Sequence, residues 1–156
     1  MSVHPNCQLI DQIVSDKGFP GRVRMLPEAA TTAKSAAAQL GVEVGAIANS
    51  LIFRTADDAP VLVMTSGAHR VDTDKVAVLI GTEIGRADAE FVRRHTGQPI
   101  GGVAPVGHPQ PIQTLIDTDL RQFPELWAAG GIPHAIFPLT FDQLVALTGG
   151  RVAEVA

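Results

Sequence analysis

Residues 101–107, with the sequence GGVAPVG, are the segment whose composition could best support chemistry. Glycine permits positive φ and close approach of a ligand to the backbone, while proline fixes the path of a loop and removes one donor. Such a loop can present free N–H groups to a carbonyl or a developing oxyanion without help from a side chain. The spacing alone is also typical of a tight turn where a strand ends.

Other catalytic motifs are missing from the sequence. It contains no Walker loop, no Gly-x-Gly-x-x-Gly, no Gly-x-Ser-x-Gly and no His-Glu-x-x-His, so the matching enzyme classes lack their markers. The 5 histidines share no metal-ligand spacing. The single cysteine, Cys7, lies in an expected helix on or near its apolar stripe, which favours a buried hydrophobe over a nucleophile. We therefore predict neither a metal nor an organic cofactor.

The composition of the chain restricts the number of domains, the possible binding partners and the cellular compartment. The chain has 156 residues, of which 46% are hydrophobic and 18% charged, and this predicts one domain over residues 1–156. The net charge of −4 predicts no non-specific attraction to DNA or anionic lipid, so any nucleic-acid contact must be local. With one cysteine, no basic signal-peptide start at residues 1–6 and no long apolar run, we expect a cytoplasmic protein without membrane insertion.

The elements that must position the loop can be predicted from periodicity and capping residues. Apolar residues at helical spacing, followed in each case by glycine, predict helices near residues 6–17, 33–40, 72–81, 88–97 and 140–149. Alternation and β-branched runs predict an edge strand, a hairpin and further short strands at 22–26, 49–54, 61–65, 100–105, 113–117, 127–129, 135–137 and 151–155. This order favours an α+β fold with a mixed, mostly antiparallel sheet.

Several blocks in a fixed order resemble the YbaK/EbsC family, which includes the editing domain associated with prolyl-tRNA synthetase. The resemblance extends over residues 25–155 and is carried by 36–42 (AAAQLGV), 47–53 (IANSLIF), 71–79, 96–107 and 129–131 (AGG). It implies a barrel-like sheet surrounded by helices. It also implies a free-standing deacylase that acts in trans on the acceptor end of a mischarged tRNA, typically tRNA for proline, with prolyl-tRNA synthetase as a possible partner.

The resemblance also implies which residues form the site. The family's Gly-x-x-x-Pro loop corresponds to Gly101 through Pro105, and the N–H groups of Gly101, Gly102 and Ala104 are expected around the ester. An aminoacyl ester is already activated, so a positioned water and preorganised N–H donors could supply most of the acceleration. No metal or cofactor is required. Editing of this kind removes errors that a synthetase pocket separates by only about 1 to 3 kcal/mol.

Further substrate contacts are expected at Asn49, at Gly130 and Gly131, and at three side chains: His134 beside the amino acid, His108 at the mouth of the site, and Arg70 near tRNA phosphate. Many family members carry a lysine where this chain has Asn49. An amide can donate and accept hydrogen bonds but lacks the charge, and Lys34, Arg54 or Arg70 could supply it.

Three functions remain open at this point. The first is the trans-editing deacylase, and the intact loop at residues 101–105 favours it. The second is a non-catalytic module that binds tRNA ends or aminoacyl ligands, favoured by the loss of the lysine at Asn49. The third is a deacylase for another small acyl ester. The sequence predicts neither the amino acid nor the oligomeric state.

Overall fold

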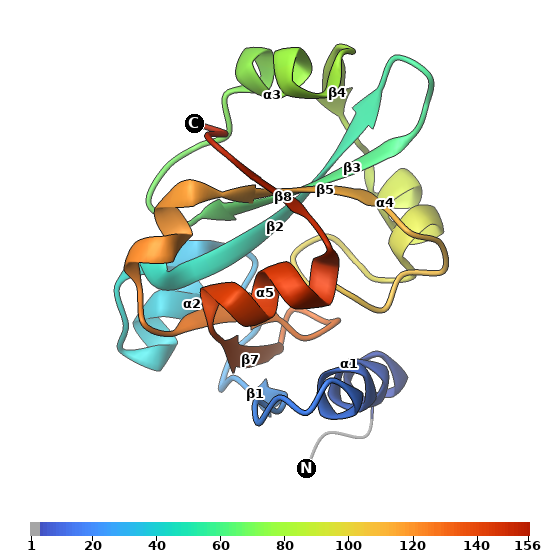
Figure 1. The fold of residues 1–156 in the computed structure, drawn as a ribbon. Coiled ribbons are helices and arrows are strands. Elements are labelled where there is room, and N and C mark those ends of the chain that lie inside the picture. The colour runs from blue at the N-terminus through green and yellow to red at the C-terminus, as the bar shows by residue number, and fades with distance from the viewer. Residues whose placement is uncertain (1–3) are drawn as a thin grey trace.

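A computed structural model describes residues 4–156, so residues 1–3, part of the stretch from which we expect no signal peptide, lie outside the described chain. Figure 1 shows helices and a strongly twisted sheet. The helices are α1 (Pro5–Asp16), α2 (Ala33–Leu40), η1 (Val44–Ala46), α3 (Thr73–Ile80), α4 (Ala89–Thr96), η2 (Thr118–Gln122) and α5 (Phe141–Thr148). The strands are β1 (Arg24–Met25), β2 (Ile47–Thr55), β3 (Pro60–Ser66), β4 (Ile84–Arg86), β5 (Gln113–Asp117), β6 (Leu126–Ala129), β7 (Ala135–Leu139) and β8 (Arg151–Ala153).

The helix boundaries follow the predicted capping residues. Side chains of Thr32, Asp72 and Asp88 accept backbone N–H groups at the starts of α2, α3 and α4. Thr140 forms a full capping box at the start of α5. The four helices end at glycines in the left-handed conformation, which removes the Cβ penalty of that backbone position. The five predicted α-helices are therefore confirmed.

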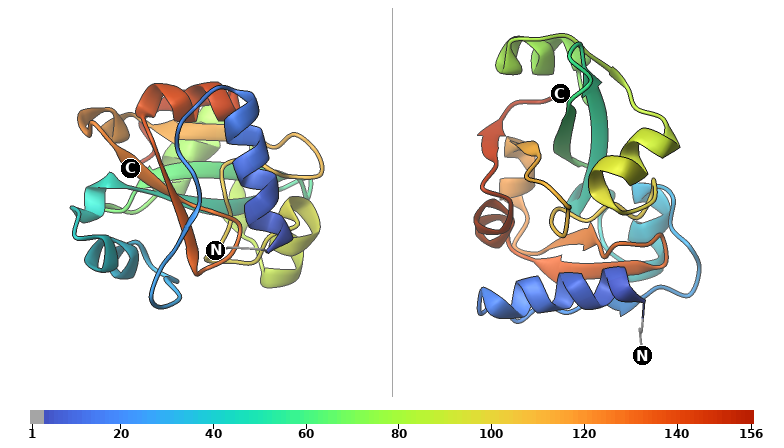
Figure 2. Two further views of the ribbon diagram at one scale, coloured as in Figure 1. Left: turned by 90° about the horizontal axis from the view of Figure 1, so that it is seen from below. Right: turned by 90° about the vertical axis from the view of Figure 1, so that its right-hand side faces the viewer.

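The sheet is mixed, as the sequence predicts. Its strand order is β1-β7-β6-β2-β3-β5-β8, with β4 pairing β2 off this path. The pairs β1–β7, β6–β7, β2–β3 and β2–β4 are antiparallel, whereas β2–β6, β3–β5 and β5–β8 are parallel. Twist turns the β6–β7 ribbon across the direction of β2 and β3, with α1 running beside that ribbon (Figure 2). The main core lies between these layers and includes Ile10, Leu62, Phe137 and Leu144.

One edge of β2 is left open in its middle. On one side β3 pairs with β2 from Ala48 to Arg54. On the other side β6 pairs only with residues 47–48 and β4 only with residues 53–55. Within the described chain, no strand therefore covers residues 49–52 on that side, and main-chain groups of the open edge are available to other partners.

Two strand predictions need correction. Residues 100–105 form a loop rather than a strand, because Gly101 adopts a φ of 86° and the loop bonds to itself. The strand expected over residues 22–26 shortens to Arg24–Met25, which pairs only with β7. The short strand β4 and the helix η2 lacked a clear signal in the sequence. Among the described residues, no helix has the length and apolarity needed to cross a membrane.

Candidate functional site

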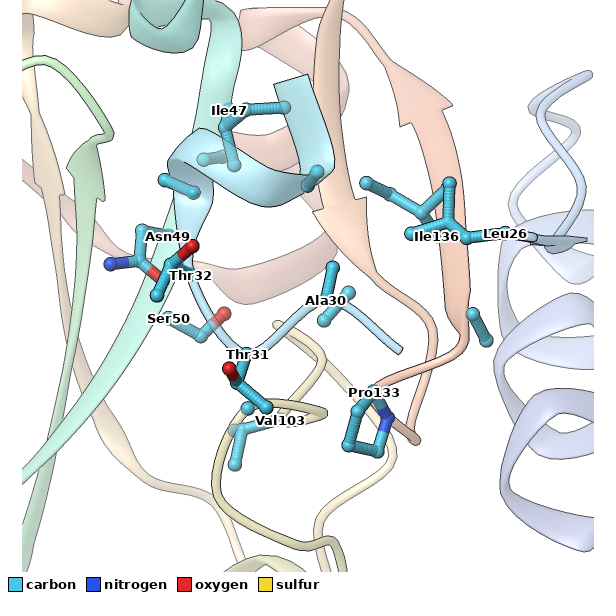
Figure 3. Close-up of a pocket in the computed structure, with 16 residues that line it drawn as sticks. Leu26, Ala30, Thr31, Thr32, Ile47, Asn49, Ser50, Val103, Pro133 and Ile136 are labelled. Carbon is cyan, nitrogen blue, oxygen red and sulfur yellow. The ribbon is translucent and has the colours of Figure 1, made fainter. Parts of the chain in front are cut away.

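Two adjoining cavities lie at the open edge of β2. The small cavity has a volume of about 40 Å³ and mostly apolar walls from the 26–36 segment, the start of β2 and the ends of β6 and β7. The large cavity has a volume of about 520 Å³ and continues along β2 toward residues 86–92. Both are lined by the same five residues: Thr31, Asn49, Ser50, Gly101 and Val103. Figure 3 shows four of these side chains grouped around the small cavity.

Asn49 and Ser50 reach the cavities because they lie where β2 has lost its second partner strand. Both are half-buried. The Ser50 hydroxyl donates to Met64 Sδ at 3.2 Å, a weak bond that leaves its oxygen free to accept. No hydrogen-bond partner of the Asn49 amide is found among the described residues, so both its donor and acceptor groups are available to a ligand.

Gln98 fixes the glycine-rich loop from inside. Its side chain is 1% exposed, and its amide oxygen accepts the Ala104 N–H at 2.7 Å. Its amide nitrogen donates to the Val106 carbonyl at 3.1 Å. The Thr96 hydroxyl holds the backbone of Gln98 through bonds to its carbonyl and from its N–H, both at 3.0 Å. The loop is thus a preorganised unit, which is what an oxyanion-binding element requires.

The loop's free N–H groups differ from those expected. Gly102 N–H donates to the Pro99 carbonyl at 2.9 Å, and Ala104 N–H is taken by Gln98. The assignment of these two N–H groups to the ester is therefore corrected, because each already has an internal acceptor. Gly101 and Val103 line both cavities, and their N–H groups have no acceptor within the described chain.

The two glycines have different steric roles. Gly101 adopts a φ of 86°, and a Cβ there would have ordinary contacts, the nearest with Thr31 Cα at 3.6 Å. Gly102 is packed against the β6–β7 turn, where a Cβ would lie 2.5 Å from Ile132 Cα. Gly101 therefore sets the backbone conformation at the cavity, whereas Gly102 permits close packing behind it.

His108 and Pro105 lie on the other side of the loop. They line a separate cavity with Ile13 and Leu147, and neither lines the small or the large cavity. A ring nitrogen of His108 bonds to the Ala104 carbonyl at 2.8 Å. Burial lowers the pKa of His108 and outweighs this bond, which raises it, so the ring is held neutral and donates. His108 supports the loop rather than the mouth of the site.

The remaining expected contacts divide between structural and exposed positions. Gly130 and Gly131 form the β6–β7 turn; Asn6 Nδ2 donates to the Gly131 carbonyl at 3.0 Å, and the neighbours Ala129 and Pro133 line the small cavity in their place. His134 is exposed and lines neither cavity; its carbonyl accepts the Leu26 N–H at 2.7 Å.

The cations suggested as replacements for the family lysine also lie away from the site. Lys34 and Arg70 are exposed and Arg54 is half-buried, and none of the three lines either cavity. Arg54 instead pairs with Asp58 at 2.7 Å and covers the ring of Phe91. Arg86 of β4, which sequence reasoning missed, lines the large cavity.

Among residues 4–156, one group of side chains could hold a cation. His69, Asp117 and Asp119 place ligand atoms within 4.8 Å of one another. His69 bonds to Asp117 and lies 3.4 Å from Asp119, and Asp117 also accepts the Ser66 N–H at 2.9 Å. These bonds account for the buried carboxylate without a metal, and the cluster lines neither the small nor the large cavity.

Sequence reasoning missed three residues that both cavities share. Thr31 was considered only as a helix cap, yet it lies outside the cap and its hydroxyl has no partner among the described residues. Ser50 and Val103 carried no signal of their own. That β2, the glycine-rich loop and Thr31 meet at the same cavities depends on the packing of distant segments, which no local motif encodes.

Known proteins resemble this chain in sequence and in fold. A family model described as "Aminoacyl-tRNA editing domain" matches residues 27–147. Protein YwhH of Bacillus subtilis (strain 168) is 29% identical over 121 residues, covering 78% of this chain and 77% of YwhH. The candidate Cys-tRNA(Pro)/Cys-tRNA(Cys) deacylase EbsC of Enterococcus faecalis (strain ATCC 700802 / V583) is 25% identical over 125 residues, covering 80% of this chain and 76% of EbsC.

A solved structure extends the likeness to nearly the whole chain. A protein described as a candidate trans-editing enzyme for prolyl-tRNA synthetase superposes with a TM-score of 0.91 at 41% identity, covering 99% of this chain and 98% of its own. The family model includes the 27–31 segment, the open edge of β2, the glycine-rich loop and the β6–β7 turn, which together enclose the two cavities. The chain therefore belongs to the aminoacyl-tRNA editing domain family, the YbaK/EbsC relatives whose blocks its sequence carries.

Proposed function

We propose that the chain is a free-standing aminoacyl-tRNA deacylase that removes a small amino acid from a mischarged tRNA in the cytoplasm. The observation that carries this proposal is the junction of the two cavities at Gly101 and Val103, whose N–H groups have no internal acceptor. Residues 1–156 act as one editing unit, and tRNA for proline is the first acceptor to test.

The two cavities differ in size as the two halves of an aminoacyl ester do. About 520 Å³ in the large cavity suits the terminal adenosine, while the small cavity of about 40 Å³ suits the amino acid. The small cavity holds on the order of three water-sized groups, since each water needs about 10 to 15 Å³ of such space. Its substrate is therefore an amino acid with a short side chain.

Ester hydrolysis at the junction needs only positioning and charge stabilisation. Water adds to the carbonyl carbon, the bond to the ribose oxygen breaks, and that oxygen takes a proton. Gly101 and Val103 N–H groups stabilise the oxyanion, and the Thr31 hydroxyl orients the water. One lost oxyanion donor costs about 100- to 1000-fold in rate in other hydrolases, so two preorganised donors account for much of the acceleration.

A second candidate function rests on the charge of the site. Within the described chain, no lysine or arginine lines the small cavity, and Asn49 stands where many family members have lysine. A module that binds the aminoacyl end without hydrolysing it would keep the same cavities. In the deacylase, the Asn49 amide contacts the substrate through hydrogen bonds alone.

Single-turnover hydrolysis of a panel of mischarged tRNAs separates the two functions. We expect the wild-type protein to hydrolyse an ester of a small amino acid and the Gly101→Ala variant to lose at least about 100-fold in rate. Gly81→Ala is the matched control, because Gly81 has a similar φ of 78° but lies at the end of α3. If every ester decays at the enzyme-free rate and Asn49→Lys restores hydrolysis, the chain is a binding module.

A further inference from the structure

A third cavity continues the large one along β2. This outer cavity has a volume of about 500 Å³ and is lined by Leu51, Ile52 and Phe53 of β2, by Thr73, and by residues 84–87. It shares Leu51, Ile52, Arg86 and Ala87 with the large cavity. The small, large and outer cavities therefore follow one another along β2 and form a single groove.

Arg86 stands where the large and outer cavities meet. It is exposed, lines both, and has no hydrogen-bond or ion-pair partner among the described residues. Asp88, the other charged residue lining the large cavity, is engaged at the start of α4, where its carboxylate accepts the Phe91 N–H at 2.8 Å. A guanidinium with free donors between two cavities is suited to bind a phosphate that links their occupants.

Phe53 provides a flat surface in the outer cavity, directly beside this cation. It is the residue of β2 that pairs in register with Arg86 of β4, so the two side chains lie on the same face of the sheet. Phe53 is only half-buried, and its neighbours in the outer cavity, Leu51 and Ile84, are apolar. An aromatic ring beside a cation is the arrangement on which single-stranded nucleic acid stacks a base and places its phosphate.

We infer that the groove binds two consecutive nucleotides of the single-stranded acceptor end. The terminal adenosine occupies the large cavity, Arg86 binds the phosphate on its 5′ side, and the preceding base enters the outer cavity and stacks on Phe53. This inference rests on the proposed function, because the ester must lie at the junction of the small and large cavities. Arg86 and Phe53 act as positioning residues, since neither touches the reacting atoms.

Three substrates of increasing length test the inference: 3′-alanyl-adenosine, the alanyl ester of the dinucleotide CpA, and the same dinucleotide lacking its first base. For the wild-type protein we expect kcat/KM to rise about 10-fold from the adenosine ester to the abasic compound, and at least about 5-fold further to the intact dinucleotide ester. An equal kcat/KM for all three overturns the inference, while hydrolysis of the adenosine ester leaves the proposed function standing.

Variants of Arg86 and Phe53 test whether these residues cause the increase in kcat/KM with substrate length. Arg86→Gln should lose about 10-fold toward both phosphate-containing esters and nothing toward alanyl-adenosine, and Arg86→Lys should recover part of the loss. Phe53→Leu should lower only the value for the intact dinucleotide, to that of the abasic one. Arg151→Gln, on β8 at the far end of the sheet, removes one exposed arginine as the matched control and should behave as wild type.

The outcomes separate a folding defect from a binding defect. If Phe53 or Arg86 only stabilises the β2–β4 pairing, its variant will lose activity toward alanyl-adenosine as well, and the inference is overturned. A wild-type protein that hydrolyses none of the esters, nor any mischarged tRNA, refutes the proposed function itself and the inference with it. On full-length mischarged tRNA, Arg86→Gln should also reduce the slope of log KM against log salt by roughly 0.7 to 1.

Discussion

The side-chain oxygen of Gln98 accepts the Ala104 N–H at 2.7 Å, so a buried amide governs which N–H groups of the glycine-rich loop remain free. The same amide donates to the Val106 carbonyl. The loop thus has an internal brace that occupies Ala104 and leaves Gly101 and Val103 available at the junction of the cavities.

Removal of this brace should cost both stability and activity. Gln98→Leu leaves the Ala104 N–H and the Val106 carbonyl buried without partners, at about 1 to 3 kcal/mol each. We therefore expect the free energy of unfolding to fall by about 2 to 6 kcal/mol in urea titrations, with a lower rate of ester hydrolysis in the folded protein. Gln143→Leu, at the exposed capping box of α5, is the control and should cost no more than about 1 kcal/mol. Equal losses for the two variants would contradict the role of Gln98.

The two adjacent glycines should respond differently to alanine. Gly101→Ala places a Cβ at a φ of 86° with no short contact, so about 1 to 2 kcal/mol of stability is lost and the protein still folds, without activity. Gly102→Ala places a Cβ 2.5 Å from Ile132 Cα and should cost about 3 kcal/mol or more. Thermal unfolding followed by circular dichroism measures both. A stable, active Gly101→Ala protein would contradict the role of that backbone.

Stability should depend on pH through His108. Its pKa is lowered in the folded state by burial, whereas the unfolded residue keeps a value near 6.5. Because the folded state favours the neutral ring, the stability of the fold is undiminished by His108 above pH 6.5. It decreases as pH falls from 6.5 toward the lower pKa of the folded state, where the buried ring must be protonated. Urea unfolding at pH 8 and pH 5.5 should therefore show a loss that is smaller in His108→Gln. If the free energy of unfolding falls equally in both proteins between pH 8 and pH 5.5, groups other than His108 cause the pH dependence.

The stability of the fold should also depend on pH in the acid range, through Asp117. Burial alone would raise the pKa of this carboxyl, but bonds from Ser66 N–H, Asp119 N–H and His69 outweigh it and lower the pKa. Its stabilising effect is present above the ordinary value of 3.8 and is lost as pH falls through the lower folded value. Asp117→Asn should be less stable at pH 7 and lack this acid transition. Identical acid unfolding curves for both proteins would refute this assignment.

The volume of the small cavity should set the range of amino acids removed. Ile47 and Ala30 are both buried walls of this cavity. Ile47→Val adds space for about one methyl group at about 0.5 to 1.5 kcal/mol of stability and should raise hydrolysis of the next larger ester by roughly 10-fold. Ala30→Val should suppress hydrolysis of all but the smallest esters. If both variants hydrolyse a panel of mischarged tRNAs with the relative rates of the wild-type protein, the volume of the small cavity does not determine specificity.

Local signals in the sequence predicted the helices well because capping is a local event. Asp72, Asp88 and Thr140 each bond within three residues of their own position, so their roles are encoded in short segments. Strand ends were less predictable. Residues 100–105 have strand-like composition, but the bonds of Gln98 and the φ of Gly101 hold them as a loop.

The candidate site was predicted at Gly101 and Asn49 and missed where it depends on register. Gly101 and Asn49 lie within recognisable blocks, whereas Thr31 and Arg86 lie outside them, and Arg86 reaches the groove because β4 pairs with the far end of β2. The N–H assignment at Gly102 and Ala104 failed for a similar reason. Whether an N–H is free depends on acceptors that only the folded loop reveals.

The open edge of β2 also bears on the tendency of this protein to aggregate. An uncovered strand edge is a template on which another chain can add a strand and begin to aggregate. Here the open stretch spans only residues 49–52, ends at β6 and β4, and lies behind Thr31, Gly101 and Val103. So short a stretch, closed at both ends by paired strands, offers few main-chain groups to an added strand, so the same pairing that leaves the edge open also limits aggregation there.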